Sequence, residues 1–178
     1  MNVRISIWIA AWALLTTGAR AQVVNEYQVK AAFIYNFSKF VEWPPQAFKT
    51  AKDPITICVL GQNPFGNALE ETVSGKMVEG RTFIVRQLSS EPAATGCQIL
   101  FVSSSERNRL HSILSDIKIT GVLTVGETET FASEGGVINF KIEAGTVRIQ
   151  VNVDAAEQAK LRISSRLLSL AQIVKSKQ

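Results

Sequence analysis

The apolar positions of residues 26–41 recur at intervals of three and four, which is the spacing of an amphipathic helix. The residues that share this face are Val29, Phe33, Ile34, Phe37, Phe40 and Val41. The helix should end at Trp43-Pro44-Pro45, because a proline disfavours helical geometry in the residue before it. Tyr35 lies on the opposite side of the helix, so we expect its ring to remain accessible.

Short apolar runs then alternate with amphipathic segments. The runs that predict strands are residues 55–60, 81–88, 98–102 and 121–125, and the segments that predict helices are 62–71 and 104–118. This alternation is typical of an α/β fold, in which helices cover both faces of a mostly parallel sheet.

The pattern changes in the last third of the chain. Residues 137–143 and 146–153 alternate apolar with polar around Ala144-Gly145, which predicts an antiparallel hairpin. Asp154 and Glu157 then have the spacing of a capping box and predict a long C-terminal helix that ends near Val174.

That helix would carry more apolar surface than one core contact requires. Leu161 and Leu168 are seven residues apart, on the side opposite its main apolar stripe. The pair could form an interface with another chain, or the first helix or a loop could cover it. Arg162 and Arg166 flank the main stripe, either as the border of such an interface or as solvated edge residues.

The N-terminus has the pattern of a secretory signal peptide. A cationic start with Arg4 precedes an apolar run at residues 5–15 and an Ala-Arg-Ala site at 19–21. We expect cleavage after Ala21, which leaves residues 22–178 as a single domain. The net charge of +4 includes Arg4 and Arg20, so removal of this segment weakens the argument for nucleic-acid binding.

Export to an oxidising compartment changes how Cys58 and Cys97 are interpreted. We predict a disulfide between them, although two separate buried thiols also fit the sequence. A bridge that closes a loop of roughly 40 residues would stabilise the fold by about 4 kcal/mol in the chain-entropy model. With two cysteines and one histidine in the chain, and no metal-ligand spacing, we expect neither a metal nor a cofactor.

Catalytic motifs are absent from the sequence. It contains no glycine-rich phosphate loop and no nucleophile elbow, and the sole histidine, His111, falls on a solvent-facing helix position. The acidic pairs Glu70-Glu71 and Glu127/Glu129 are expected to be solvated. We therefore predict a non-catalytic binding protein.

An alternative is a periplasmic receptor for a small ligand. Its pocket would lie at the carboxyl ends of the parallel strands, near residues 61–66 and 103–105. Gly61 and Asn63-Pro64 would then offer backbone N–H groups to an anion.

Several blocks of sequence resemble the YfiR family of periplasmic proteins. The blocks are Tyr-Gln-Val-Lys-Ala-Ala-Phe at 27–33, Phe-Val-Glu-Trp-Pro at 40–44, Gly-Gln-Asn-Pro-Phe-Gly at 61–66, Cys-Gln-Ile-Leu-Phe-Val at 97–102 and Leu-Arg-Ile-Ser-Ser-Arg-Leu-Leu at 161–168. The resemblance implies a repressor that binds the periplasmic sensor domain of a membrane-bound diguanylate cyclase, which lowers cyclic di-GMP and biofilm formation.

The resemblance also implies a homodimer that an outer-membrane lipoprotein can sequester. Family members tend to have a redox-sensitive disulfide, and Cys58 and Cys97 look like that pair. The stretch 131–140 lacks the second cysteine pair of some relatives. The residues predicted to contact a partner are Tyr35, Leu161, Arg162, Arg166 and Leu168.

Overall fold

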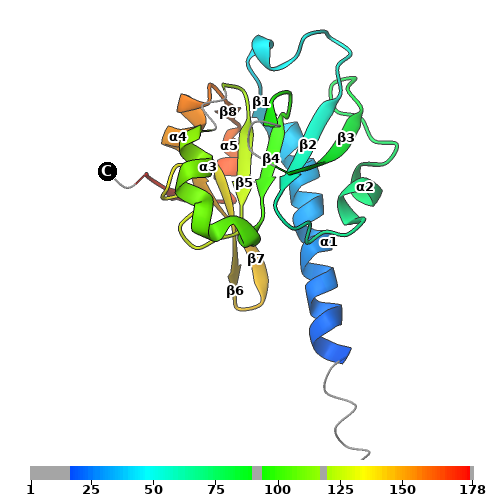
Figure 1. The fold of residues 1–178 in the computed structure, drawn as a ribbon. Coiled ribbons are helices and arrows are strands. Elements are labelled where there is room, and N and C mark those ends of the chain that lie inside the picture. Colours follow the sequence, from blue (N-terminus) through cyan, green and yellow to red (C-terminus); the bar gives the residue numbers. More distant parts are fainter. Residues whose placement is uncertain (1–16, 90–93, 117–119, 177–178) are drawn as a thin grey trace, which may run out of the picture.

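The computed structural model describes residues 17–89, 94–116 and 120–176 (Figure 1). A seven-stranded sheet has the order β3-β2-β4-β5-β6-β7-β9, and a two-stranded sheet joins β1 to β8. The strands are β1 (Val41–Glu42), β2 (Ile55–Leu60), β3 (Phe83–Leu88), β4 (Ile99–Val102), β5 (Leu123–Gly126), β6 (Ile138–Glu143), β7 (Thr146–Asn152), β8 (Arg162–Ile163) and β9 (Gln172–Val174). The pairs within the large sheet are parallel except for β6–β7, so the predicted mostly parallel α/β fold with an antiparallel hairpin is confirmed.

Helices cover the sheet on both faces. The helical segments are α1 (Thr17–Phe40), η1 (Pro45–Ala47), α2 (Ala68–Val73), η3 (Ser104–Arg109), α3 (Leu110–Asp116), α4 (Val153–Gln158) and α5 (Ser165–Leu168). On one face Ile34 and Phe37 of α1 pack on Val59 and Phe101. On the other face Ile113 of α3 belongs to a second apolar cluster. All six residues of β2 are buried, as expected of a central strand.

The C-terminal segment does not form the long helix that its apolar spacing predicts. It forms α4, β8, α5 and β9 in succession. The α4 helix ends because Lys160 adopts a left-handed conformation, with φ 57°, and Leu161 N–H then donates to the carbonyl of Ala156. This is the Schellman arrangement that closes many helices. The N-cap is Asn152, whose side chain accepts from Ala155 N–H.

A disulfide joins Cys58 of β2 to Cys97, two residues before β4, and confirms the predicted pairing. The two Cα atoms are 5.9 Å apart, and both side chains are buried in the cluster beneath α3. The bridge therefore links β2 to the segment that leads into the neighbouring strand β4.

Phe131 occupies a narrow space between two glycines. A Cβ atom at Gly126 would lie 2.2 Å from the Phe131 ring, and one at Gly136 would lie 2.1 Å from it. The ring is fully buried, in the same cluster as the disulfide. These two positions therefore require residues without a side chain.

Most of the predicted signal peptide, residues 1–16, lies outside the described residues, and α1 begins at Thr17. Cleavage after Ala21 stays a prediction. Within the described ranges, no helix has both the length and the hydropathy that a bilayer crossing requires.

Candidate functional site

A buried ion pair connects α1 to the carboxyl end of β5. Lys30 Nζ lies 2.7 Å from Glu127 Oε2, and each side chain is 4% exposed. Lys30 Nζ also lies 2.6 Å from Glu26 Oε1, one turn earlier in α1. The prediction that Glu127 is solvated is therefore wrong, because the carboxylate turns inward to meet a lysine on the apolar face of the helix.

The Glu127 carboxylate accepts two further hydrogen bonds. Tyr27 Oη donates to Oε2 at 3.1 Å, and Ser104 N–H donates to Oε1 at 3.2 Å. Burial raises the pKa of Tyr27 well above its usual value, and the negative charge of Glu127 raises it further. Lys30 lies three positions before Phe33, so a cation within the apolar stripe was the available sequence signal for this network.

Two pockets of about 410 and 500 Å³ lie at the carboxyl ends of β2 and β4, where the small-ligand alternative places its site. Gln62 N–H donates to Ser105 Oγ at 2.9 Å, and Phe65 N–H donates to Asn63 Oδ1 at 2.9 Å. The Glu106 side chain also approaches Gly61, since a Cβ there would lie 2.9 Å from Glu106 Oε1. Two N–H groups of this segment therefore already have partners within the chain, while Arg107 and Glu106 add charges of opposite sign to the lining. Binding of a small ligand here stays a prediction. The α2 helix begins at Ala68 and not at Asn63.

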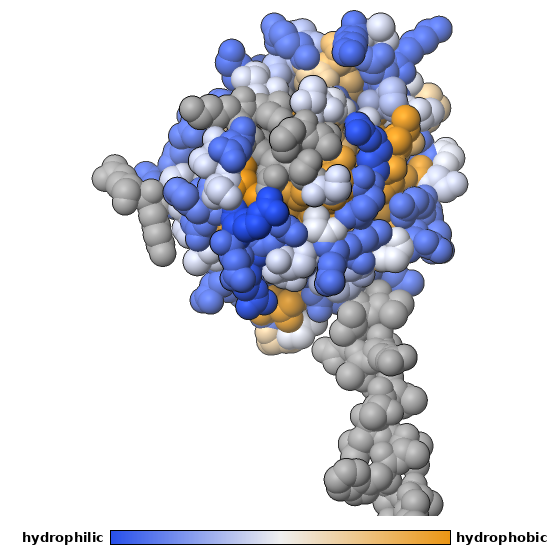
Figure 2. All heavy atoms as spheres, viewed as in Figure 1, coloured by the Kyte–Doolittle hydropathy of each residue, from blue (hydrophilic) through white to orange (hydrophobic). Residues whose placement is uncertain are grey.

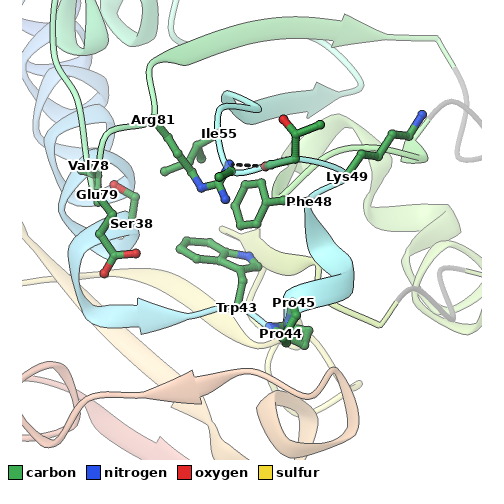
Figure 3. Close-up of a pocket in the computed structure, with 12 residues that line it drawn as sticks. Ser38, Trp43, Pro44, Pro45, Phe48, Lys49, Ile55, Val78, Glu79 and Arg81 are labelled. Atoms are coloured by element: carbon green, nitrogen blue, oxygen red, sulfur yellow. Dashed lines mark hydrogen bonds between the residues drawn. The ribbon is translucent and has the colours of Figure 1, made fainter.

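A pocket of about 390 Å³ lies at the opposite end of the strands (Figure 3). The Trp43 and Phe48 rings meet edge to face with centroids 6.3 Å apart. The Arg81 guanidinium carbon lies 3.7 Å from the Phe48 ring centroid, and Arg81 Nη1 donates to the carbonyls of Thr50 and Asp53. Figure 3 shows these three side chains grouped beside Ile55. The pocket therefore combines two aromatic rings with charged side chains of both signs, namely Lys49, Arg81 and Glu79.

Buried Gln98 fixes the turn beneath this pocket. Its Oε1 accepts from Thr56 N–H at 2.8 Å, its Nε2 donates to the Ala47 carbonyl at 2.7 Å, and its own carbonyl accepts from Trp43 Nε1 at 3.2 Å. These contacts connect the Trp-Pro-Pro segment to β2 and β4. The sequence does not indicate this structural role of Gln98, because a strand pattern carries no information about side-chain hydrogen bonds.

The predicted partner residues do not share one surface. Leu161 is 3% exposed and packs in the core below α1, so its prediction as an exposed partner contact is corrected. The physical reason is the end of α4 at Lys160, which turns the next residue inward. Arg162 and Arg166 are exposed, and Leu168 is half-buried against the core.

Arg162 belongs to the two-stranded sheet in which β8 pairs with β1, the strand that follows α1. It pairs with Glu42 in the β1–β8 register, and its Nε lies 3.6 Å from Glu42 Oε2. Both side chains are highly exposed, so the ion pair contributes little to stability. Leu170 (70%) and Ile173 (47%) add exposed apolar surface to this segment.

Tyr35 lies away from the C-terminal segment. Its ring meets Phe83 of β3 with centroids 5.6 Å apart, and Lys76, which follows α2, lies over the ring. In Figure 1, α2 and α5 flank α1 on opposite sides. The structure thus separates Tyr35 from Arg162, Arg166 and Leu168.

Within residues 17–89, 94–116 and 120–176, no group of three or more His, Cys, Asp or Glu side chains could hold a metal ion. His111 is exposed on α3, as predicted.

Comparisons with known proteins give a family and a fold. A conserved domain protein from Vibrio cholerae has a TM-score of 0.58 at 10% identity, with 84% of this chain and 60% of that chain covered. The ABC domain in complex with L-Trp from Streptococcus pneumoniae has a TM-score of 0.50 at 13% identity, with 67% and 55% covered. The chain thus spans less than two thirds of either protein, and at these identities the likeness shows the fold alone. No curated protein matches the chain. The YfiR/HmsC-like family model matches residues 27–172, which include nearly all of the described fold, and the chain belongs to that family.

Proposed function

We propose that the chain is a non-catalytic periplasmic regulator that represses a membrane-bound diguanylate cyclase by binding the cyclase's periplasmic sensor domain. Repression would lower cyclic di-GMP and biofilm formation. The family match over residues 27–172 carries the proposal, since it supports a periplasmic regulatory role. The Cys58–Cys97 disulfide fits an oxidising compartment.

Repression by binding needs a difference in affinity between two conformations of the cyclase. If the regulator binds the inactive sensor conformation more tightly, it shifts the population toward that state. Each tenfold preference contributes about 1.4 kcal/mol to the shift. A rigid domain is suited to this task, because little of its binding energy is lost in ordering its own backbone.

The exposed and half-buried residues of the C-terminal segment would supply one surface for such binding. We define the C-terminal surface as Arg162, Arg166, Leu168, Leu170 and Ile173. It combines two arginines with apolar side chains, a composition that is enriched in protein interfaces. We also propose that the protein forms a homodimer and that an outer-membrane lipoprotein sequesters it.

Deletion of the gene tests the regulatory role. Cyclic di-GMP should rise in the deletion strain and return to its original level when the gene is restored. The rise should vanish when the partner cyclase carries an inactivating substitution in its catalytic domain. An unchanged level in a strain with an intact cyclase contradicts the proposal.

Direct binding tests the surface. The substitution Leu170→Asp should weaken binding of residues 22–178 to the purified sensor domain in isothermal titration calorimetry, since Leu170 is 70% exposed. Ile142→Asp is the matched control, because Ile142 is 46% exposed at the hairpin between β6 and β7. Figure 2 shows an apolar group at that end of the molecule. Equal losses in the two variants would reject the C-terminal surface as the contact.

A further inference from the structure

Two lysines from different elements converge on the ring of Tyr35. Lys39 Nζ lies 4.2 Å from the ring centroid and Lys76 Nζ lies 4.5 Å from it. Lys39 is one turn further along α1, whereas Lys76 follows α2. The negative face of an aromatic ring attracts a cation. The Tyr35 ring therefore contacts two ammonium groups, one from α1 and one from the segment that follows α2.

Neither ammonium group has an acidic partner among the described residues. The ion pairs of that part of the chain involve other lysines and arginines, namely Lys30, Arg109, Lys141 and Arg162. Glu70 borders the same groove without an ion pair to Lys76. Neither lysine forms an ion pair, so both ammonium groups are available to an anionic ligand.

Apolar surface lies directly beside the two cations. Met77 is 56% exposed, and the half-buried Phe83 ring packs against Tyr35. A groove of about 400 Å³ between α2 and β3 continues this surface, with Val73 and Val85 among its lining residues. A ligand that fits this site must join a negative charge to an apolar side chain.

We propose that the Tyr35 surface, made of Tyr35, Lys39, Lys76, Met77 and Phe83, binds an acidic segment of a protein partner. A carboxylate of that segment would contact Lys39 and Lys76, and a neighbouring apolar side chain would pack on Met77 and Phe83. The inference deepens the proposed function, on which it rests, because it assigns the chemistry that the sensor domain presents.

A protein segment fits the surface better than an anionic bilayer does. Binding to a bilayer uses a broad cluster of basic residues that all face the lipid. Here Glu70 borders the groove beside Lys76, and Glu71 and Glu79 are also exposed in this part of the chain, so a wide negative surface would be repelled. A narrow acidic segment can reach Lys39 and Lys76 without approaching those glutamates.

Fluorescence anisotropy with a short rhodamine-labelled peptide of alternating glutamate and leucine tests the proposal. The peptide should bind residues 22–178, and Lys39→Gln/Lys76→Gln should weaken binding by about tenfold, since both charged contacts are lost. The matched control Lys52→Gln/Lys141→Gln removes the same charge elsewhere and should change the affinity less than twofold. Tyr35→Phe should bind like the wild type, whereas Tyr35→Leu should bind more weakly because the lysines lose their ring.

Three results would overturn the inference. The first is equal weakening in the two double variants, and the second is equal binding of a peptide of alternating glutamine and leucine. The third is Lys39- and Lys76-dependent binding to phosphatidylglycerol vesicles without binding of the acidic peptide. Titration with the cyclase sensor domain separates this inference from the proposed function. If the sensor domain binds the wild type and Lys39→Gln/Lys76→Gln equally, the inference alone is rejected. If the sensor domain binds neither protein, the proposed function is rejected, and the peptide experiment then tests the inference independently.

Discussion

Lys30 and Glu127 form an ion pair of 2.7 Å between side chains that are each 4% exposed, and they lie 97 residues apart in the chain. The pair attaches the aromatic α1 helix to the carboxyl end of β5. A buried charge is costly because it has been removed from water. Loss of one partner therefore destabilises the fold, since the other charge stays buried without compensation.

Glu127→Gln should therefore lower the free energy of unfolding by about 3 kcal/mol, the lower end of the range for a broken buried pair, because Glu26 remains beside Lys30. Lys30→Met/Glu127→Leu should restore part of that loss, since no charge is then buried. Urea unfolding followed by circular dichroism measures both variants. Glu129→Gln is the control, and a loss as large as that of Glu127→Gln would contradict the assigned role of the pair.

Tyr27 should make the fold sensitive to alkali. Its pKa is raised in the folded state by burial and by Glu127, so the unfolded chain loses the phenolic proton first as pH rises. The stability that depends on the protonated phenol is present below pH 10 and is lost progressively above it. The wild type should lose stability more steeply above pH 10 than Tyr27→Phe does in thermal unfolding at a series of pH values. Parallel curves for the two proteins would exclude this role.

The disulfide should be inaccessible until the protein unfolds, because Cys58 is 0% exposed and Cys97 is 2% exposed. Thiol titration of the native exported protein should find no free thiol, and titration after denaturation in reductant should find both. Reduction should cost about 2–4 kcal/mol of unfolding free energy. Cys58→Ala/Cys97→Ala should be insensitive to reductant, and rapid reduction of the folded wild type would contradict the burial of the bridge.

Gly136→Ala should destabilise the domain by about 1–3 kcal/mol, the usual cost of overpacking a core. The added methyl group would lie 2.1 Å from Phe131 Cε1. Phe131→Leu should remove most of the clash, so Gly136→Ala should cost less in that background than in the wild type. A double-mutant cycle of melting temperatures measures the coupling, and additive effects would show that the ring does not restrict this position.

Substitution by aspartate should destabilise the fold at Leu161 but not at Leu170. Leu161 is 3% exposed and Leu170 is 70% exposed. Leu161→Asp should prevent folding, because it buries a charge without a partner, and Leu161→Ala should cost about 2–5 kcal/mol. Leu170→Asp should leave the melting temperature nearly unchanged. A folded Leu161→Asp protein would restore Leu161 as a surface residue.

Much of the fold follows from local patterning. The apolar run in β2 corresponds to a strand that is buried on both faces, and β6 and β7 lie where the alternating pattern places them. In β6, however, burial follows position along the strand, since residues 138–140 are buried and residues 141–143 are exposed. The pairing of Cys58 with Cys97 was predictable because the chain contains two cysteines and has the N-terminal pattern of an exported protein.

Tertiary structure decided the conformation of residues 154–174 and the pairing of Lys30 with Glu127. The spacing of residues 154–174 is helical throughout, yet Ser164 N–H donates to the Phe40 carbonyl and β8 pairs with β1, so contacts with a distant segment replace helical hydrogen bonds. Lys30 lies within the apolar stripe of α1, whereas Glu127 has the sequence context of a solvated charge, and the two become a buried pair because the fold brings α1 beside the end of β5. Local pattern reports which side chains avoid water, whereas the partner of a buried polar group depends on chain segments that meet only after folding.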